Sequence, residues 1–170
     1  RQMCIRDSSC GNKLLEIPLE LIRDDPTLDL PFYLYWANES WRKTWFGQDN
    51  KIVWEQKYGT ELDWRAQFDY CLQYFKDSRY IKIDGKPVYA IYNAWDIPNQ
   101  NRFLSLWDEW AREAGLPGIY FVKTIGRHEK DECGRFSARV TREPNYTFAY
   151  GEKLFENCLL YTSDAADDRI

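Results

Sequence analysis

Asparagine, carboxylate and tryptophan side chains gather directly after an apolar run in the first quarter of the chain. Residues 30–36 read LPFYLYW, and Asn38, Glu39 and Trp41 follow within five positions. A carboxylate can move a proton or hold a sugar hydroxyl, and an amide can fix the same hydroxyl. A tryptophan face suits the apolar edge of a sugar ring. These residue types in this order point to a glycan as the ligand.

The same mixture recurs after a second apolar run, residues 87–92. Repetition at two strand ends favours a glycan cleft over two unrelated loops. Asp96 precedes an Ile-Pro pair, which is also typical of a turn or cap, so it ranks below Glu39. Glu39 is therefore the candidate catalytic residue, although the spacing alone leaves a site role and a structural role equally open. The candidate substrate-binding residues are Trp36, Asn38, Trp41, Tyr92, Asn93, Trp95 and Asp96.

Each of these assignments has a structural alternative. Glu39 could be a loop carboxylate paired with Arg42 or Lys43, and a tryptophan more often packs in a core than binds a ligand. Of Trp36 and Trp41, one could line a sugar subsite while the other closes the end of the fold.

Three apolar runs predict buried parallel strands, at residues 30–36, 87–92 and 118–123. Continuous apolar character suits a strand that is covered on both faces better than a half-exposed one. Their carboxyl ends would then share one edge of the sheet and bring the polar residues after the first two strands together. Lys123 ends the third run and is expected to be solvated.

Two amphipathic helices separate these strands, at residues 60–75 and 101–114. Thr60 and Asp63 resemble a capping box at the start of the first, and Gly115 suits the end of the second. Pro18 opens a short helix through Arg23, since proline lacks only a donor that a first turn does not use. The helix aromatics expected in the core are Trp64, Phe68, Trp107 and Trp110.

Asp84-Gly85 between residues 80–83 and 86–92 is a strong hairpin signal, so a small extra strand should fold against the second main strand. The alternation of helices and strands implies right-handed βαβ crossovers and a parallel sheet. A doubly wound sheet and a (β/α)8 barrel both fit this order. No glycine-rich turn follows a strand, which weakens a nucleotide-binding Rossmann reading.

Bulk properties exclude several partners. A net charge of -4 argues against a nucleic-acid surface, and the chain has no apolar run long enough to span a membrane. A metal site is disfavoured, because the five cysteines are scattered and the chain has a single histidine, His128. We expect His128 to lie in a surface loop. We therefore expect a reduced, cytoplasmic setting, no cofactor and no metal. The oligomeric state stays open.

Four motifs in order resemble one known family. They are PFYLYWANESW, EQKY at 55–58, FKDSRYIKIDGKPVYAIY at 75–92 and WAREAGLPGIY at 110–120. Together they are similar to the glycosyltransferase WbsX family, also described as the glycoside hydrolase family 99-like domain. The resemblance implies a carbohydrate-active enzyme of bacterial polysaccharide or O-antigen biosynthesis, related to retaining α-mannosidase-type hydrolases.

The resemblance also implies an α/β fold, a partial (β/α)8 TIM barrel of glycosidase type, with parallel strands and outer helices. A full barrel takes about 250 residues, so residues 11–157 would supply a central part that is incomplete at both ends. Residues 1–10 and 158–170 break the pattern abruptly and are interpreted as non-native tails.

In the hydrolase relatives, the resemblance places paired glutamates in a late Asn-Glu-Trp-x-x-Glu-Gly stretch that has no counterpart here. Residues 108–113 imitate it, but they lie inside a predicted helix. Glu109 and Glu113 would stand one turn apart on a solvated helix face, where they cannot flank a glycosidic bond. We therefore expect the chain to be inactive by itself, with transferase and hydrolase chemistry both open. The alternatives are a non-catalytic glycan-binding α/β module and a plain scaffold.

Overall fold

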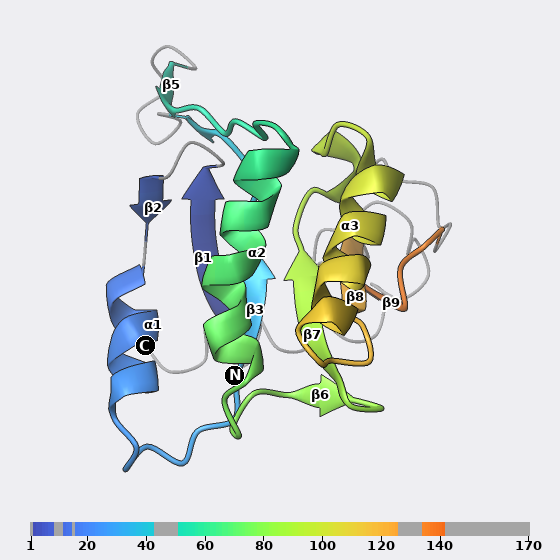
Figure 1. The fold of residues 1–170 in the computed structure, drawn as a ribbon. Coiled ribbons are helices and arrows are strands. Elements are labelled where there is room, and N and C mark those ends of the chain that lie inside the picture. The colour runs from blue at the N-terminus through green and yellow to red at the C-terminus, as the bar shows by residue number, and fades with distance from the viewer. Residues whose placement is uncertain (1, 9–11, 15, 43–50, 126–133, 142–170) are drawn as a thin grey trace, which may run out of the picture.

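The computed structural model describes residues 2–8, 12–14, 16–42, 51–125 and 134–141 (Figure 1). Strands and helices alternate through most of this part of the chain. In chain order the elements are β1 (Gln2–Ser8), β2 (Asn12–Leu14), α1 (Glu16–Asp24), β3 (Tyr33–Trp36), β4 (Trp41–Arg42), β5 (Ile52–Trp54), α2 (Glu61–Phe75), β6 (Lys82–Ile83), β7 (Lys86–Ile91), the short 3-10 helix η1 (Ala94–Asp96), α3 (Gln100–Glu113), β8 (Tyr120–Ile125) and β9 (Ala138–Thr141).

The main sheet is parallel, as the alternation of helices and strands predicts. Its order among the described residues is β2-β1-β3-β7-β8-β9, and every pair from β1 to β9 along this path is parallel. Of the strands in the described ranges, only β2, beside β1, and β6, beside β7, join this sheet antiparallel. Each parallel strand is therefore added on the same side of the one before it.

The strand register decides which side chains meet the helices. Leu34, Tyr89 and Phe121 are in register across β3, β7 and β8, so they share one face. Tyr35 and its partners occupy the other face. The first face forms one buried core with side chains from all three helices, including Leu19 of α1, Phe68 of α2 and Trp107 of α3. Figure 1 shows α2 and α3 lying in front of the sheet. The described helices thus cover the same face.

The predicted strands are confirmed with shifted bounds. β3 begins at Tyr33, later than expected, and β8 runs two residues further than the apolar pattern suggested. The Asp84-Gly85 hairpin is also confirmed. Both residues have positive φ, 51° and 76°, as a tight two-residue turn of this kind requires.

The capping box of α2 is confirmed. The backbone N–H and hydroxyl of Thr60 both donate to Asp63 Oδ2, at 2.7 and 2.8 Å. Gly59 precedes it with φ +60°, and a Cβ there would lie 2.4 Å from the same oxygen. Only glycine therefore lets the chain enter the helix with this cap in place.

α3 is confirmed and ends before Gly115, whose φ of 84° suits a helix terminus. Asp108 accepts a hydrogen bond from the Ile119 N–H at 2.9 Å and so joins the helix to β8. Glu109 and Glu113 are exposed, and Glu113 pairs with Arg65 at 3.3 Å. The stretch that imitates a catalytic motif is therefore structural, as expected.

Gln2–Ser8, within the segment interpreted as a non-native tail, forms β1 and pairs with β3. Whether the segment is native stays a prediction. Two other expectations need adjustment. Lys123 is buried rather than solvated, because its register with Ile91 places it on the helix-covered face. Trp110 is partly buried, with the Arg65 guanidinium 5.3 Å from its ring centre, whereas Trp64, Phe68 and Trp107 are fully in the core.

His128 and the segment 158–170 lie outside the described residues, so the expectations for them stay predictions. Within the described part of the chain, no helix has the length and apolar character needed to cross a membrane.

Candidate functional site

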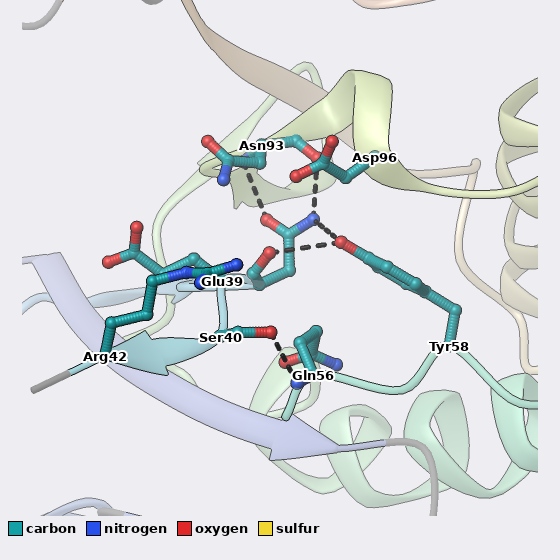
Figure 2. A pocket seen from close by; sticks show the side chains of 8 residues that line it. Glu39, Ser40, Arg42, Gln56, Tyr58, Asn93 and Asp96 are labelled. Carbon is teal, nitrogen blue, oxygen red and sulfur yellow. Dashed lines mark hydrogen bonds between the residues drawn. The ribbon is translucent and has the colours of Figure 1, made fainter. Parts of the chain in front are cut away.

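A polar pocket of about 510 Å³ opens where β3 and β7 end (Figure 2). These strands are parallel neighbours, so their carboxyl ends meet at one edge of the sheet. The pocket is lined by Asn38, Glu39, Ser40, Arg42, Gln56, Tyr58, Asn93 and Asp96. Four of these, Asn38, Glu39, Asn93 and Asp96, are residues that the sequence pattern singles out.

The small hairpin of β4 and β5 supplies part of the lining. Trp41 is opposite Trp54 in this antiparallel pair, which folds the chain back on itself after β3. The Gln56 N–H donates to Ser40 Oγ at 3.0 Å and closes the open end of the hairpin. Ser40 and Gln56 line the pocket because the hairpin brings them together. No pattern in the sequence predicts this pairing.

Asn38 was expected to hold a sugar hydroxyl, but its side chain is committed to the protein. It is fully buried, and its Nδ2 donates to the Asn93 carbonyl at 2.7 Å and to the Tyr58 hydroxyl at 3.1 Å. Its Oδ1 accepts from the Asn93 N–H at 2.7 Å. Both amide hydrogens are therefore used inside the protein, and the Asn38 side chain joins segments that line the pocket. Contact between Asn38 and a sugar stays a prediction.

Tyr58 is a pocket residue that sequence reasoning missed. Its hydroxyl donates to the Asn38 carbonyl at 3.1 Å, its ring meets Trp36 edge-on, and its carbonyl accepts from Trp64 Nε1 at 2.7 Å. Burial is the main reason that the pKa of Tyr58 rises to about 12, and the nearby charge of Asp96 adds to it. The hydroxyl therefore stays protonated at neutral pH.

Trp36 lies in the core instead of the pocket. It is 1% exposed and stacks on Phe103 of α3, with ring centres 5.7 Å apart. The reason is the alternation along β3, which turns Trp36 to the same face as Leu34. Tyr92 is half-buried, contacts the Tyr35 ring edge-on, and does not line the pocket.

Two predicted tryptophans are exposed and lie next to pocket-lining residues in the sequence. Trp41 is 44% exposed and Trp95 48%, unusually high values for so large an apolar side chain. Each is adjacent in sequence to pocket-lining residues: Trp41 lies between Ser40 and Arg42, and Trp95 precedes Asp96. Their role in sugar binding stays a prediction.

Glu39, Asn93 and Asp96 are brought together as expected, from two loops that are far apart in sequence (Figure 2). The Glu39 N–H donates to the Ala37 carbonyl at 2.9 Å, a tight turn that leaves the carboxylate exposed. Arg42 adds a positive charge to the two negative ones. In the part of the chain that the structure describes, no three histidine, cysteine or acidic side chains form a metal cluster.

Comparison with known proteins gives a family for this arrangement. A family described as Glycosyltransferase WbsX matches residues 9–164. Relatives from two strains of Xanthomonas campestris pv. campestris, B100 and ATCC 33913, both named Uncharacterized protein WxcX, are 28% identical over 137 residues, or 79% of this chain. The chain spans about a fifth of their length, 19%.

No solved structure matches the chain. The family match nevertheless covers both loops of the pocket and agrees with the resemblance carried by the sequence motifs. The chain belongs to the glycosyltransferase WbsX family.

Proposed function

We propose that this chain forms a glycan-binding wall of a carbohydrate-active enzyme, a WbsX-type glycosyltransferase of bacterial polysaccharide or O-antigen biosynthesis. The polar pocket at the ends of β3 and β7 is the observation that carries the proposal. Family membership supplies the class of chemistry. Because the chain spans about a fifth of its curated relatives, the activity belongs to the larger protein.

The pocket offers the groups that sugar recognition requires. Glu39 and Asp96 can accept hydrogen bonds from hydroxyls, Arg42 can donate them, and the Asn93 amide can do both. Trp41 and Trp95 are exposed and adjacent in sequence to pocket-lining residues, and we propose that their ring faces stack on a bound sugar. A polar pocket with exposed tryptophans on the same loops suits a hydroxyl-rich ligand.

The proposed architecture is a partial (β/α)8 TIM barrel. A doubly wound sheet reverses its direction of growth and carries helices on both faces. Here the parallel strands follow one another in chain order, and the described helices share one face. Both features support the barrel, as does the pocket at the carboxyl ends of the strands.

Glu39 is proposed to bind substrate, with proton transfer as its second possible role. Two-carboxylate glycoside chemistry needs groups about 5 to 10 Å apart on opposite sides of the bond, supplied by different loops. Glu39 and Asp96 come from different loops, whereas the resemblance assigns the family's glutamate pair to a later stretch. We therefore assign hydroxyl binding to both residues. We also propose that the protein works in the cytoplasm.

The binding test titrates the 170-residue chain with mannobiose and longer mannose oligosaccharides by calorimetry. We expect saturable binding that Glu39→Ala weakens and Glu109→Ala, an exposed carboxylate on α3, leaves unchanged. Equal effects of both substitutions, or no binding by the unmodified chain, would contradict the assignment.

The activity test uses the full-length protein that contains this chain, with mannose-containing acceptors and nucleotide-sugar donors. Donor-dependent transfer is expected. Hydrolysis without any donor would overturn the transferase reading in favour of a glycoside hydrolase. Binding without transfer or hydrolysis would favour the alternative, a non-catalytic glycan-binding α/β module.

A further inference from the structure

The pocket has two walls that belong to neighbouring strands. The first wall consists of Glu39, Ser40 and Arg42, which follow β3, and the second consists of Asn93 and Asp96, which follow β7. Backbone pairing between the strands continues to the Tyr92 N–H, which donates to the Trp36 carbonyl at 2.9 Å. Past this bond each chain turns into its own loop.

The Asn38 side chain takes over where the backbone pairing stops. Its Oδ1 accepts from the Asn93 N–H and its Nδ2 donates to the Asn93 carbonyl, both at 2.7 Å. An amide side chain presents the same donor and acceptor as a peptide group. Asn38 therefore adds one more rung between the walls, built from a side chain on one side and backbone on the other.

The same amide also holds Tyr58, a third lining residue of the pocket. Its second hydrogen goes to the Tyr58 hydroxyl, which donates in turn to the Asn38 carbonyl (Figure 2). Tyr58 is anchored by the Trp64 indole of α2 and by edge contact with Trp36. One buried side chain thus joins three segments that line the pocket.

We propose that Asn38 is a positioning residue whose buried amide sets the separation of the two pocket walls, so that the pocket is formed before a sugar enters it. The bonds are made inside the protein and need no ligand. A preformed site avoids the cost of ordering loops on binding. The ligand part of this inference rests on the proposed function; the positioning part does not.

Amide hydrogen exchange by NMR tests the positioning directly in the 170-residue chain. The Asn93 N–H should be protected in the unmodified protein although it lies past the end of β7. Asn38→Ala should speed its exchange about tenfold relative to the Tyr89 N–H. Asn38→Asp keeps an acceptor for this N–H and should retain more protection than the alanine variant.

We call the hydrogen bonds that the Asn38 side chain makes with Asn93 and Tyr58 the clamp. Asn93→Ala is the matched control for exchange, because Asn93 takes part in the clamp through its backbone alone. Its residue 93 amide should stay protected. Equal loss of protection along β7 and β8 in the Asn38 variants would mean general destabilisation and would overturn the proposal. Unchanged exchange at residue 93 would overturn it as well.

Mannobiose titration tests whether positioning matters for binding. Asn38→Ala should lower the affinity about tenfold. Tyr58→Phe removes both hydrogen bonds between Tyr58 and Asn38 but keeps the two bonds from Asn38 to Asn93, so it should lower the affinity less. If the alanine variant does not fold, the aspartate and phenylalanine variants carry the test. Lost protection with unchanged affinity would overturn the role in binding. If the unmodified chain binds no mannose oligosaccharide, the proposed function is wrong. The exchange experiment still shows whether Asn38 holds the two pocket walls in place.

Discussion

The two ends of the parallel sheet use polar residues in opposite ways. At the carboxyl ends of β3 and β7, one buried amide organises exposed carboxylates around a pocket. At the amino end of β3, Arg79 and Asp77 form an ion pair at 2.7 Å in which both side chains are only 13% exposed. The first arrangement leaves exposed carboxylates facing a pocket. In the second, the two charged side chains also line a pocket, of about 410 Å³, but they are paired with each other.

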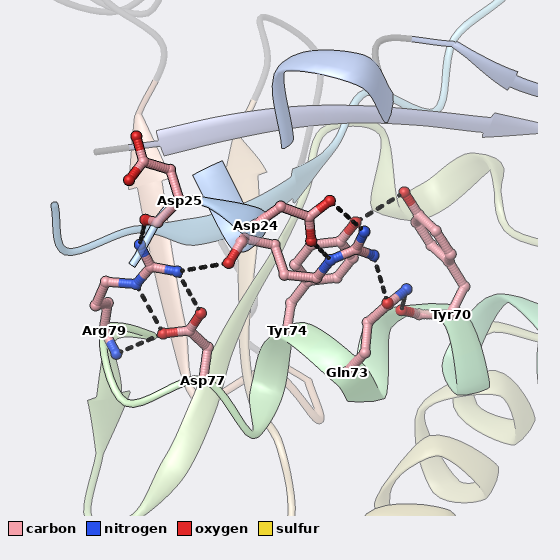
Figure 3. A network of polar contacts seen from close by, with 8 residues as sticks. Asp24, Asp25, Tyr70, Gln73, Tyr74, Asp77 and Arg79 are labelled. Atoms are coloured by element: carbon pink, nitrogen blue, oxygen red, sulfur yellow. Dashed lines mark hydrogen bonds and ion pairs between the residues drawn. The ribbon is translucent and has the colours of Figure 1, made fainter. Parts of the chain in front are cut away.

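Arg79 connects segments that are far apart in the sequence (Figure 3). Its guanidinium donates to the carbonyls of Asp25 and Leu28, both at 2.9 Å, and to that of Arg23 at 3.3 Å. These carbonyls belong to the end of α1 and the loop before β3, while Arg79 follows α2. The cluster thus ties the first crossover to the second.

This difference between the two ends of the sheet is the one expected of α/β proteins. Loops at the carboxyl ends of strands carry function, and the opposite end carries stability. Arg79 and Asn38 both join separate segments of the chain, but the segments that Asn38 joins line the candidate binding pocket. Substitutions at the two ends should therefore separate stability from binding.

Arg79→Ala should cause the largest effect, a fall of several degrees in Tm with unchanged mannobiose affinity. It removes the partner of Asp77 and leaves backbone carbonyls without their donor. Arg102→Ala is the control, since its pair with Glu61 is about half exposed and should contribute little. Thermal denaturation by circular dichroism compares the two. Weaker sugar binding by Arg79→Ala would contradict the assignment of stability to one end of the sheet and binding to the other.

Trp41→Ala should do the reverse, lowering mannobiose affinity about tenfold. Its ring is exposed, so the free energy of unfolding should change by only about 0.5 kcal/mol. Leu62→Ala removes another exposed apolar side chain, on α2 away from the pocket, and should affect neither quantity. A large stability loss with normal affinity would show that Trp41 is structural.

Acid should weaken the Arg79 end. The guanidinium lowers the pKa of Asp77 below its ordinary value, so the stability it provides is present above about pH 4 and is lost as the pH falls through the lower, folded-state pKa. Asp77→Asn should therefore flatten the acid limb of the stability curve, measured by urea unfolding from pH 5 downwards. Asp69→Asn, at an exposed pair on α2, should leave the limb nearly unchanged.

Alkali should weaken the pocket end, by the smallest amount. The pKa of Tyr58 is about 12 in the folded protein, above its ordinary value of about 10. The contribution of the protonated hydroxyl to the free energy of unfolding is therefore full below pH 10 and is lost as the pH approaches 12. Tyr58→Phe should make stability less dependent on pH in this window. The same slope in both proteins would show that Tyr58 does not titrate as its burial implies.

Much of the fold could be predicted because its signals are local. Asp84-Gly85, the Thr60 and Asp63 cap, and Gly115 each define a boundary through the conformation of a few neighbouring residues. The parallel sheet followed from alternating strands and helices. The strand at Gln2–Ser8 could not be predicted, because its reading as a non-native tail removed it from consideration.

The candidate site was harder to predict because its partners are distant in sequence. Position after a strand correctly indicated Glu39, Asn93 and Asp96, but it could not show that Asn38 bonds to residues 20 and 55 positions away. Trp36 was misplaced although a signal existed. In residues 32–36, phenylalanine, leucine and tryptophan alternate with tyrosines, and this alternation marks the core face.

The mutual bonds between Asn38 and Tyr58 have a consequence for engineering. They fasten together the two ends of the segment 39–57, which carries the hairpin and one pocket wall. With its ends joined, such a segment can change in length at low entropic cost, about 0.6 kcal/mol for each doubling of a flexible loop. We therefore expect inserts of different length between these two anchors to be tolerated, which would offer a route to altered ligand preference.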